Sequence, residues 1–352
     1  MTPLADLLIR RIRATGPITL ADYMADCLLH PDHGYYVTRD PFGTAGDFIT
    51  APEISQMFGE LVGLALAQSW LDQGAPSPFT LAELGPGRGT LMADLLRATR
   101  RVPGFHASAR LHLIEASPAL RARQREALTG FACTWLTETG ALPDQPTFAI
   151  ANEFFDALPI RQFTRDPAGW RETLVGETDG TLTPGLSAAA PLAALAHRLH
   201  DTRPGDIVEI CPSALPITAA LGTRIATHGG AALIIDYGNW GSQGDTFQAV
   251  QAHAQTNPFC APGLADLTAH VDFAALAAAS PTAHAFAEQG AFLRSLGIAQ
   301  RGARLGALLT GDVAENHRAA THRLTAPAEM GTLFKVLALY PANAPPPPGL
   351  HG

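Results

Sequence analysis

The 352-residue chain contains a single lysine, Lys335. A P-loop that cradles nucleotide phosphates needs a lysine directly after its glycine turn, so this class of nucleotide site is excluded. The chain also has no basic tract, and its formal net charge is −8. Because contacts between basic side chains and phosphates supply most of the affinity for nucleic acid, we expect nucleic acid not to be its partner.

Cysteine is scarce as well. The four cysteines are widely scattered and form no C-x-x-C pair: Cys27, Cys133, Cys211 and Cys260. This pattern argues against a disulfide framework or a zinc site and predicts reduced thiols. The histidines add no metal motif, because Pro31 separates His30 from His33 and no third ligand lies in register. We therefore expect no metal.

Long apolar runs are also missing. No segment reaches the roughly 18 apolar residues that a membrane-spanning helix requires. The N-terminal segment has the arginines of a transit peptide, but Leu4, Leu8 and Ile12 fit the inner face of an ordinary helix that Gly16-Pro17 would end. We expect an ordinary first helix and a bacterial cytoplasmic protein.

The stretch that organises the chain is FTLAELGPGRGTLMADLL, from Phe79 to Leu96. It reads as a buried strand closed by Glu83, a loop with Gly85, Gly87 and Gly89, and a helix that Thr90 would cap. Such a loop brings backbone N–H groups against a charged ligand. The loop does not match the G-x-G-x-x-G fingerprint of dinucleotide-binding sites, because Thr90 occupies the position of the third glycine in that fingerprint. The stretch resembles the first motif of class I S-adenosylmethionine methyltransferases; a glycine-rich turn that binds nothing is the alternative.

Two further positions fit the same cofactor. The next predicted strand, 110–114, ends in Glu115, which lies 26 residues beyond Gly89. Doubly wound folds place a ribose-binding carboxylate near this spacing, although a lone acid can also be a solvated strand end. The third predicted strand, 131–136, carries Trp135, whose ring could lie against adenine or pack in the core.

A pair of carboxylates follows the fourth predicted strand, 147–151. Glu153 and Asp156 stand three residues apart, and ligands of doubly wound sheets lie outside the carboxyl ends of the strands. Beside a methyl donor, two carboxylates can bind a cationic acceptor, and one can take the proton lost on methylation. The alternative is a capped turn in which Asp156 bonds the backbone.

The alternation of strands and helices from Phe79 onward predicts an α/β fold with a parallel sheet. Residues 160–205 interrupt it with patterns of β-hairpins and a helix from Pro191 to His200, residues 241–270 read as loop, and the proline-rich tail, 341–352, should be loose. Upstream, residues 1–75 form a helical segment, with one helix from Thr50 or Pro52 to Trp70. Spacing alone favours a plain cap on the core over a lid for this segment.

Seven blocks together resemble the MidA family, whose eukaryotic members are mitochondrial complex I assembly factors that act as protein arginine methyltransferases. The blocks are GDFITAPEISQMFGE, LAELGPGRGT, LHLIEAS, ANEFFDALPIRQF, IIDYG, ADLTAHVDF and MGTLFKVLAL. The resemblance covers essentially the whole chain. It implies a class I methyltransferase with a Rossmann-like seven-stranded sheet across residues 76–340, an inserted β-hairpin and helical subdomain, and an N-terminal helical lid in which GDFITAPEISQ folds over the donor.

The resemblance implies S-adenosylmethionine as the cofactor and a protein arginine as the acceptor, in the large quinone-module subunit of NADH dehydrogenase. The predicted donor-site residues are Thr50, Glu83, Gly85, Pro86, Gly87, Gly89, Glu115, Ala116, Trp135 and Asn152. The predicted catalytic residues are Glu153 and Asp156. Further lid or acceptor residues are Asp47, Ser55, Gln56, Asp236 and His270. A non-catalytic assembly chaperone that binds the cofactor, and a small-molecule methyltransferase, remain alternatives.

Overall fold

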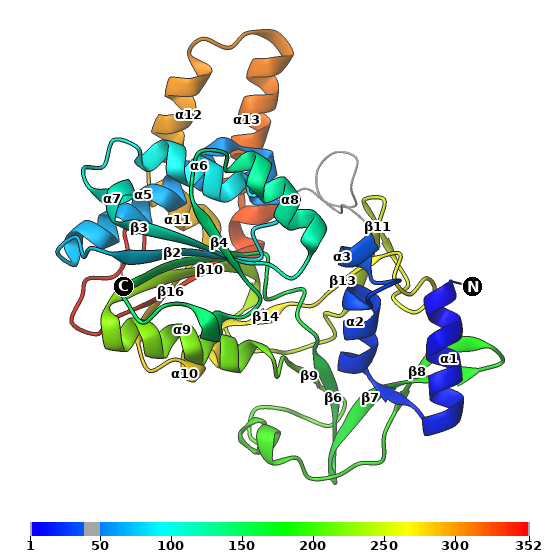
Figure 1. Cartoon of the computed structure of the whole chain (residues 1–352). Coiled ribbons are helices and arrows are strands. Elements are labelled where there is room, and N and C mark those ends of the chain that lie inside the picture. The colour runs from blue at the N-terminus through cyan, green and yellow to red at the C-terminus, as the bar shows by residue number, and fades with distance from the viewer. Residues whose placement is uncertain (1, 39–49, 351–352) are drawn as a thin grey trace. The chain divides into compact units, whose positions relative to one another are not determined.

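The computed structural model describes residues 2–38 and 50–350 (Figure 1). The chain divides into two compact units. We call residues 49–155, 215–238 and 273–352 the sheet unit, and residues 1–48, 156–214 and 239–272 the accessory unit. Each is described by itself.

Seven strands follow one another along the main sheet of the sheet unit. Their order is β15 (Ala283–Glu288), β16 (Phe334–Tyr340), β10 (Gly230–Asn239), β5 (Thr147–Asn152), β2 (Phe79–Leu84), β3 (Ala109–Ile114) and β4 (Cys133–Leu136). Neighbours pair in parallel except at β16, which runs antiparallel to both β10 and β15. The predicted α/β class with a Rossmann-like seven-stranded sheet is thereby confirmed.

Helices cover both faces of this sheet. Figure 1 shows α5 (Gln56–Asp72), α6 (Thr90–Thr99) and α7 (Phe105–Ser108) on one side, and α9 (Ala214–His228) and α10 (Phe273–Ala279) on the other. Leu91 and Leu95 turn inward from α6 and are buried, as their spacing predicts. At Gly63 of α5, an added Cβ would lie 2.6 Å from Leu95 Cγ, so only glycine permits this close contact between α5 and α6.

Several helices differ from the sequence expectation. The helix expected from Thr50 or Pro52 to Trp70 is two helices, α4 (Ala51–Ile54) and α5, because Ser55 between them adopts an extended conformation with φ −158°. Farther along the chain, Gly297 has a left-handed φ of 86° and separates α11 (Gln289–Ser295) from α12 (Ile298–Gly306). The helix α13 (Gly311–Thr325) was not predicted. The remaining elements of the sheet unit are α8 (Pro118–Ala127), the short 3₁₀ turn η1 (Thr139–Ala141) and the π turn η3 (Pro327–Gly331).

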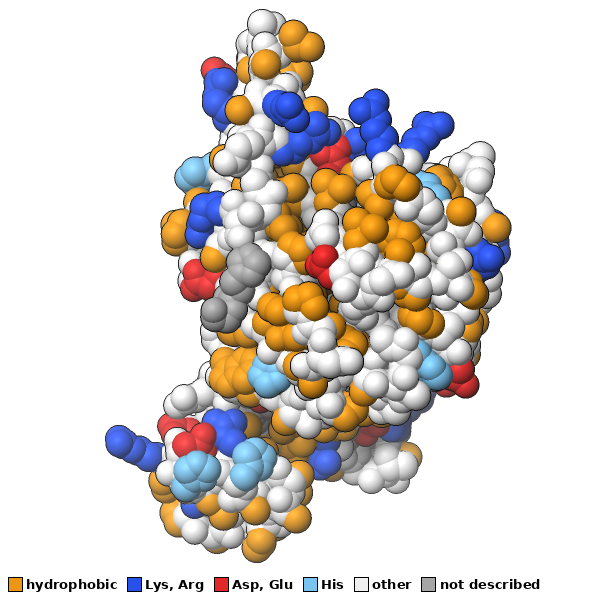
Figure 2. All heavy atoms as spheres, turned by 90° about the vertical axis from the view of Figure 1, so that its left-hand side faces the viewer, with side chains coloured by type: hydrophobic (Ala, Val, Ile, Leu, Met, Phe, Trp, Pro, Cys, Tyr) orange, Lys and Arg blue, Asp and Glu red, His pale blue; other side chains and the backbone are white. Residues whose placement is uncertain are grey.

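The helices α12 and α13 form a hairpin that projects from the rest of the sheet unit (Figure 1). Figure 2 shows it as a narrow column with hydrophobic and basic side chains on its surface. At its tip, Leu308 is 93% exposed and Val313 is 60% exposed. At its base, Arg301 of α12 donates to the buried carboxylate of Glu60 on α5 at 2.7 Å, and Arg97 of α6 reaches the same carboxylate at 2.5 Å. A buried carboxylate needs such partners, so the three helices are tied together at Glu60.

Residues 341–350 of the C-terminal tail, the part of it that the structure describes, are not loose. Leu350 is 1% exposed and belongs to the core of the sheet unit. An added Cβ at Gly349 would lie 2.7 Å from the ring of Phe292 on α11. The prediction from proline content was therefore wrong, because the apolar residue after the proline run packs against α11.

The accessory unit contains the N-terminal helices and the inserted strands. The helices are α1 (Pro3–Thr15), α2 (Leu20–Leu29) and α3 (Tyr35–Thr38), with a 3₁₀ helix, η2 (Ala193–Leu199). One sheet has the order β1 (Ile18–Thr19), β7 (Gly169–Thr178), β6 (Arg161–Asp166) and β9 (Ile207–Ile210), with β8 (Thr181–Leu186) paired to β7. The predicted first helix, its end at Gly16 and the inserted hairpins are confirmed; the helix expected from Pro191 to His200 is a shorter 3₁₀ helix.

The segment 241–270, expected to be loop, holds a second small sheet. Its strands follow the order β12 (Ala254–Thr256), β11 (Gln248–Gln251) and β13 (Asp266–Thr268), and β14 (Val271–Asp272) comes after them. Strands of three or four residues leave too little alternation to be recognised in a sequence. Ala249 and Leu267 from this sheet share a hydrophobic core with Leu8 of α1, Met24 of α2 and Val175 of β7.

Across residues 2–38 and 50–350, no helix is both long and apolar enough to cross a bilayer. Within the same ranges, no group of three or more histidine, cysteine or acidic side chains is arranged to hold a metal.

Candidate active site

The carboxyl ends of four parallel strands meet at one edge of the main sheet. Leu84 of β2 is in register with Ile114 of β3 and Ala151 of β5, and Asn152 is in register with Ile235 of β10. The residues that follow these strands therefore emerge together, as a parallel sheet requires. They include the glycine loop, Glu115 and Glu153, and Asp236 of β10 lies at the same edge, one residue beyond Ile235.

The glycine loop turns from β2 into α6 through left-handed backbone conformations. The φ angles are 62° at Gly85, 52° at Gly87 and 85° at Gly89, and Gly89 N–H closes the turn on the Pro86 carbonyl at 2.7 Å. Gly89 occupies the N-cap position of α6, so the expectation that Thr90 caps this helix was wrong. A helix that begins without a side-chain cap keeps backbone N–H groups available to a ligand.

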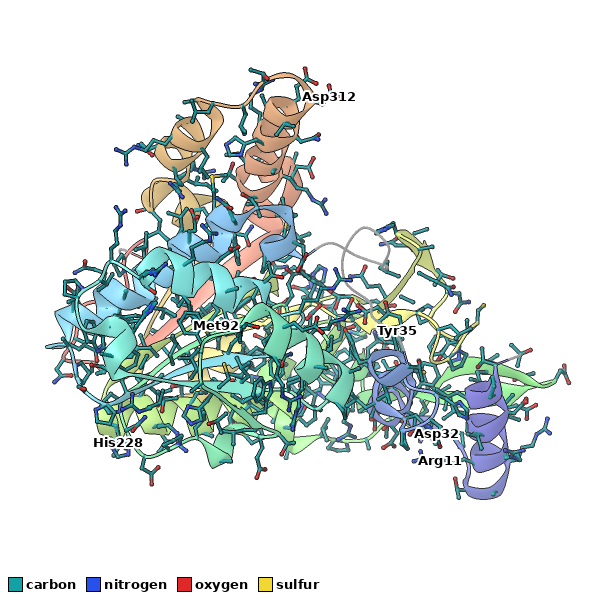
Figure 3. The ribbon with its side chains drawn as sticks, turned by 45° about the horizontal axis from the view of Figure 1, so that its top comes forward. Arg11, Asp32, Tyr35, Met92, His228 and Asp312 are labelled. Atoms are coloured by element: carbon teal, nitrogen blue, oxygen red, sulfur yellow. The ribbon has the colours of Figure 1, made fainter. Side chains whose placement is uncertain are left out.

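The carboxylate of Glu83 lies beneath the start of α6. Its side chain is 3% exposed, and the backbone N–H of Met92, the α6 residue labelled in Figure 3, stabilises the ionised form. Glu83 Oε2 has no hydrogen-bond partner among the residues that the structure describes. Burial raises the pKa of Glu83 to about 8, because a carboxylate out of water is disfavoured until a cation or a donor reaches it.

A second unsatisfied acceptor stands at the same edge. Asn152 is buried, and within the described ranges its Oδ1 atom also has no hydrogen-bond partner, while its Nδ2 donates to Glu153 Oε1 at 3.1 Å. Buried acceptors without donors are costly, and both of these would be satisfied by a ligand that donates protons. A protonated amine is the best match, because a cation beside Glu83 would stabilise the ionised form that burial disfavours. The residues present thus fit the amino end of S-adenosylmethionine.

The pKa of Glu83 gives this fit a measurable consequence. At pH 7 the carboxyl group of the free protein is mostly protonated, because its pKa of about 8 lies above the pH. An amine bound beside it favours the carboxylate, so binding of S-adenosylhomocysteine at pH 7 should release up to about one proton. The release should disappear well above pH 8, where Glu83 is already ionised.

Calorimetry in buffers with different ionisation enthalpies measures this proton count. The variant E83Q, which keeps the side-chain size, isolates the contribution of Glu83 from that of the ligand amine. An equal proton count for the wild type and E83Q at pH 7 would refute the assignment of Glu83 to the amine.

Glu115, directly after β3, is held by the loop that follows it and by α8. One carboxylate oxygen accepts from Ser117 N–H at 2.7 Å, and the other accepts from Gln124 Nε2 at 3.1 Å. Burial raises the pKa of Glu115, while hydrogen bonds from Ser117, Gln124 and the Ala116 backbone oppose this shift. The Gln124 side chain also accepts from Trp135 Nε1 at 2.8 Å, so Glu115 and Trp135 belong to one network. The sequence analysis did not assign Gln124 to the site.

Glu153, directly after β5, contacts the start of α4. Its backbone is left-handed, with φ 49°, which is a strained conformation for a residue other than glycine. Its Oε1 atom accepts from Ala51 N–H at 2.9 Å. At the other end of α4, Glu53 accepts from the Thr90 hydroxyl at 2.6 Å. The short helix α4 is therefore bonded both to the glycine loop's helix and to Glu153, and Thr50 lies buried at its N-cap.

Asp236, in the last part of β10, orients the loop that carries Glu153. It is fully buried, its Oδ2 accepts from Phe155 N–H at 3.0 Å, and its Oδ1 accepts from Tyr237 N–H at 2.9 Å. The neighbouring Phe154 packs against the glycine loop so closely that a Cβ at Gly85 would lie 2.8 Å from its ring. The glycine loop and the loop after β5 are therefore in direct contact.

Comparison with known proteins shows the family to which the chain belongs. A family model described as "Putative S-adenosyl-L-methionine-dependent methyltransferase" matches residues 61–291, which span the strands and loops above. The chain belongs to this methyltransferase family. The resemblance to the MidA family is confirmed, and S-adenosylmethionine is its cofactor.

Relatives of the methyltransferase align over nearly its whole length. It is 38% identical to the bovine protein named protein arginine methyltransferase NDUFAF7, mitochondrial, over 100% of this chain and 85% of the bovine one. It is 37% identical to the Drosophila melanogaster homolog, over 96% and 85%. Among solved structures, a superfamily member from Burkholderia thailandensis bound to S-adenosyl-homocysteine superposes with a TM-score of 0.80 at 30% identity, over 99% and 92% of the two chains.

The remaining predicted lid and acceptor residues lie in several different parts of the methyltransferase. Ser55 caps α5, with its Oγ accepting from Met57 N–H at 3.2 Å, and Gln56 is exposed at the first residue of α5. Asp156 and His270 belong to the accessory unit, where the Asp156 carbonyl accepts from Ala269 N–H at 3.0 Å. His270 lines a cavity of about 380 Å³ together with residues of β11 and β12. Asp47 lies outside the described residues.

Proposed function

We propose that this methyltransferase methylates an arginine side chain of a protein, in the large quinone-module subunit of NADH dehydrogenase. The mitochondrial relatives are named protein arginine methyltransferases, which supports the acceptor class. The observation that carries the proposal is the Glu153 carboxylate. It follows β5 at the same sheet edge as Glu83 and the glycine loop. The resemblance to the MidA family supports this choice of substrate. It also supports the proposal that the protein acts in a bacterial cytoplasm.

On the donor side, S-adenosylmethionine supplies a methyl group activated by its sulfonium charge. Glu83 and Asn152 would hold the amino end, since both present buried acceptors that need donors. The backbone of Gly85, Pro86, Gly87 and Gly89 would lie against the methionine part. Glu115, with Ala116 beside it, would bind the ribose hydroxyls, and Trp135 would face the adenine.

On the acceptor side, Glu153 and Asp156 would bind the guanidinium. Arginine remains protonated at neutral pH and its planar fork matches carboxylates bidentately. Carboxylates that localise the positive charge on one nitrogen would leave a usable lone pair on another. That nitrogen would attack the methyl carbon as the bond from this carbon to sulfur breaks, which leaves S-adenosylhomocysteine, and one carboxylate would accept the proton that the nitrogen loses. Positioning of the two reactants supplies most of the acceleration, with about 7–11 kcal/mol available at best. Asp236 would hold the loop of Glu153 through Phe155.

The lid would include α4 with Thr50, Ser55 and Gln56. The helix α4 is bonded to Glu153, on the proposed acceptor side, and to Thr90, beside the glycine loop on the proposed donor side. Its position can therefore depend on whether the donor and the acceptor are bound. We propose that residues 1–75 serve as this lid segment, that residues 76–340 form the methyltransferase domain, and that the insertions at 160–205 and 241–270 contribute His270 to acceptor binding.

Mass spectrometry of NADH dehydrogenase purified from strains with and without the gene tests this function. We expect one arginine of the large quinone-module subunit to carry methyl groups in the first strain and none in the second. An unmethylated subunit in both strains would contradict the proposed substrate. If the strain without the gene fails to assemble NADH dehydrogenase, and neither strain carries the methylation, the result would instead favour the assembly-chaperone alternative.

A further inference from the structure

Gln124 joins three parts of the donor site that are distant in the sequence. It lies on α8 and is fully buried. Its Nε2 atom donates to the Gly87 carbonyl at 2.8 Å and to Glu115 Oε2 at 3.1 Å. Its Oε1 atom accepts from Trp135 Nε1 at 2.8 Å. One side chain thus contacts the glycine loop, the acid after β3 and the aromatic residue of β4.

The chemistry of the three partners leaves one orientation for the amide. An indole N–H can only donate, while a carbonyl and a carboxylate without a proton can only accept. The amide oxygen must therefore face Trp135, and the two amide hydrogens must face Gly87 and Glu115. Glutamate would place a second acceptor against Glu115 and the Gly87 carbonyl, and an apolar side chain would leave all three partners unsatisfied. Among side chains of this length, only glutamine meets all three requirements.

The helix that carries Gln124 is itself anchored to the same edge. One turn earlier, Arg121 Nε donates to the backbone carbonyl of Glu115 at 2.9 Å. The next residue, Arg125, places its guanidinium 4.7 Å from the centre of the Trp135 ring, within the range of a cation–π contact. The position of Gln124 along the sheet is therefore fixed by its neighbours on α8.

We propose that Gln124 is a positioning residue that holds Gly87, Glu115 and Trp135 in the arrangement that binds the donor, Gly87 on its methionine side and Glu115 and Trp135 on its adenosine side. This inference rests on the donor-site assignment in the proposed function. Preorganised groups bind more tightly because less order has to be imposed when the ligand arrives. Gln124 acts through its three partners and needs no contact with the cofactor.

The test measures the dissociation constant of S-adenosylhomocysteine by calorimetry for Q124M, which keeps the length of the side chain and removes the amide. We expect the constant to rise about 10-fold or more, the scale of one buried hydrogen bond lost. Q124E should weaken binding at least as much. The matched control is Q289M, because Gln289 is equally buried in the sheet unit and its Nε2 bonds the Leu324 carbonyl on α13 instead of a predicted donor-site residue.

A double-mutant cycle separates positioning from a general effect on folding. If Gln124 acts through Glu115, Q124M should weaken binding much less in an E115A background than in the wild type. In steady-state assays, KM for the donor should rise while kcat at saturating donor changes little. Q289M should match the wild type in both.

The outcomes are distinguishable. Unchanged affinity in Q124M, or an effect that simply adds to that of E115A, would overturn the role of Gln124. Wild-type affinity in E115A itself would instead overturn the donor-site assignment on which the inference rests.

Discussion

Replacing the Glu153 carboxylate by an amide, in E153Q, should lower methyl transfer to an arginine-containing substrate by on the order of 100-fold or more, the scale expected when a positioned acid–base group is lost. The same result is expected for D156N. Donor affinity should remain nearly unchanged. In E153Q the amide oxygen of the new side chain can still accept from Ala51 N–H, which in the native protein lies 2.9 Å from Glu153 Oε1, so the contact with α4 is retained and only the charge is lost.

Single-turnover transfer and calorimetric binding of S-adenosylhomocysteine should be measured on the same preparations. E126Q is the matched control, because Glu126 is exposed on α8 and the chemical change is identical. Full transfer by both E153Q and D156N would show that these carboxylates are structural. The acceptor site would then have to be sought at Asp236 or His270. Variants that bind the donor, lose transfer and still support complete assembly of NADH dehydrogenase would favour the chaperone alternative.

The second large effect is expected at the glycine loop. G87V should lose S-adenosylhomocysteine binding by at least about 100-fold, because a branched side chain blocks the approach of the ligand to the backbone at this position. Gly87 has φ 52°, so valine also strains the backbone there. G311V supplies the control for that strain, since Gly311 has φ 57° and open space around its Cβ position at the tip of the α12–α13 hairpin.

Circular dichroism should show both variants folded, and calorimetry should show binding only in G311V. Native-like affinity in a folded G87V would contradict the assignment of the loop to the donor. Loss of binding in both variants would mean that the strain, and not the blocked approach, causes the defect.

Much of the sheet edge that carries the proposed donor site could be predicted from the sequence, because the residues that signal it lie close together in the chain. The apolar run 79–84, the glycines behind it and the inward leucines of α6 lie within twenty residues of one another, and each follows from strand or helix periodicity. Once the strands were expected to be parallel, the residues after them had to share an edge. Glu83, Glu115 and Glu153 stand at this edge, as register pairing requires.

The parts that could not be predicted depend on contacts between distant residues. Gln124 meets Gly87 across 37 positions, and Glu53 meets Thr90 across the same separation. A glutamine inside a helical pattern and a glutamate in a helix's first turn are ordinary features, so neither is a signal on its own. Arg121 and Gln124 lie one helical turn apart, shortly after the LHLIEAS block that contains Glu115, and this nearness was the one hint in the sequence.

The break between α4 and α5 and the short strands of the segment 241–270 were also not predicted, because they too depend on contacts that the local sequence does not reveal. Ser55 carries no proline or glycine signal, yet it divides α4 from α5 because its hydroxyl caps the second helix. The strands β11, β12 and β13 are too short for a period to show, and they form only because they pair with one another over a shared core. In both places tertiary contacts decide the local structure.

The central claim is that this site transfers a methyl group from S-adenosylmethionine to arginine. The most direct test incubates the purified protein with methyl-labelled S-adenosylmethionine and the purified large quinone-module subunit, and locates the label by fragment-ion mass spectrometry. We expect label on the guanidino nitrogens of an arginine, strongly reduced with E153Q. Label confined to any other side chain, or no label from a protein that binds the donor, would contradict it.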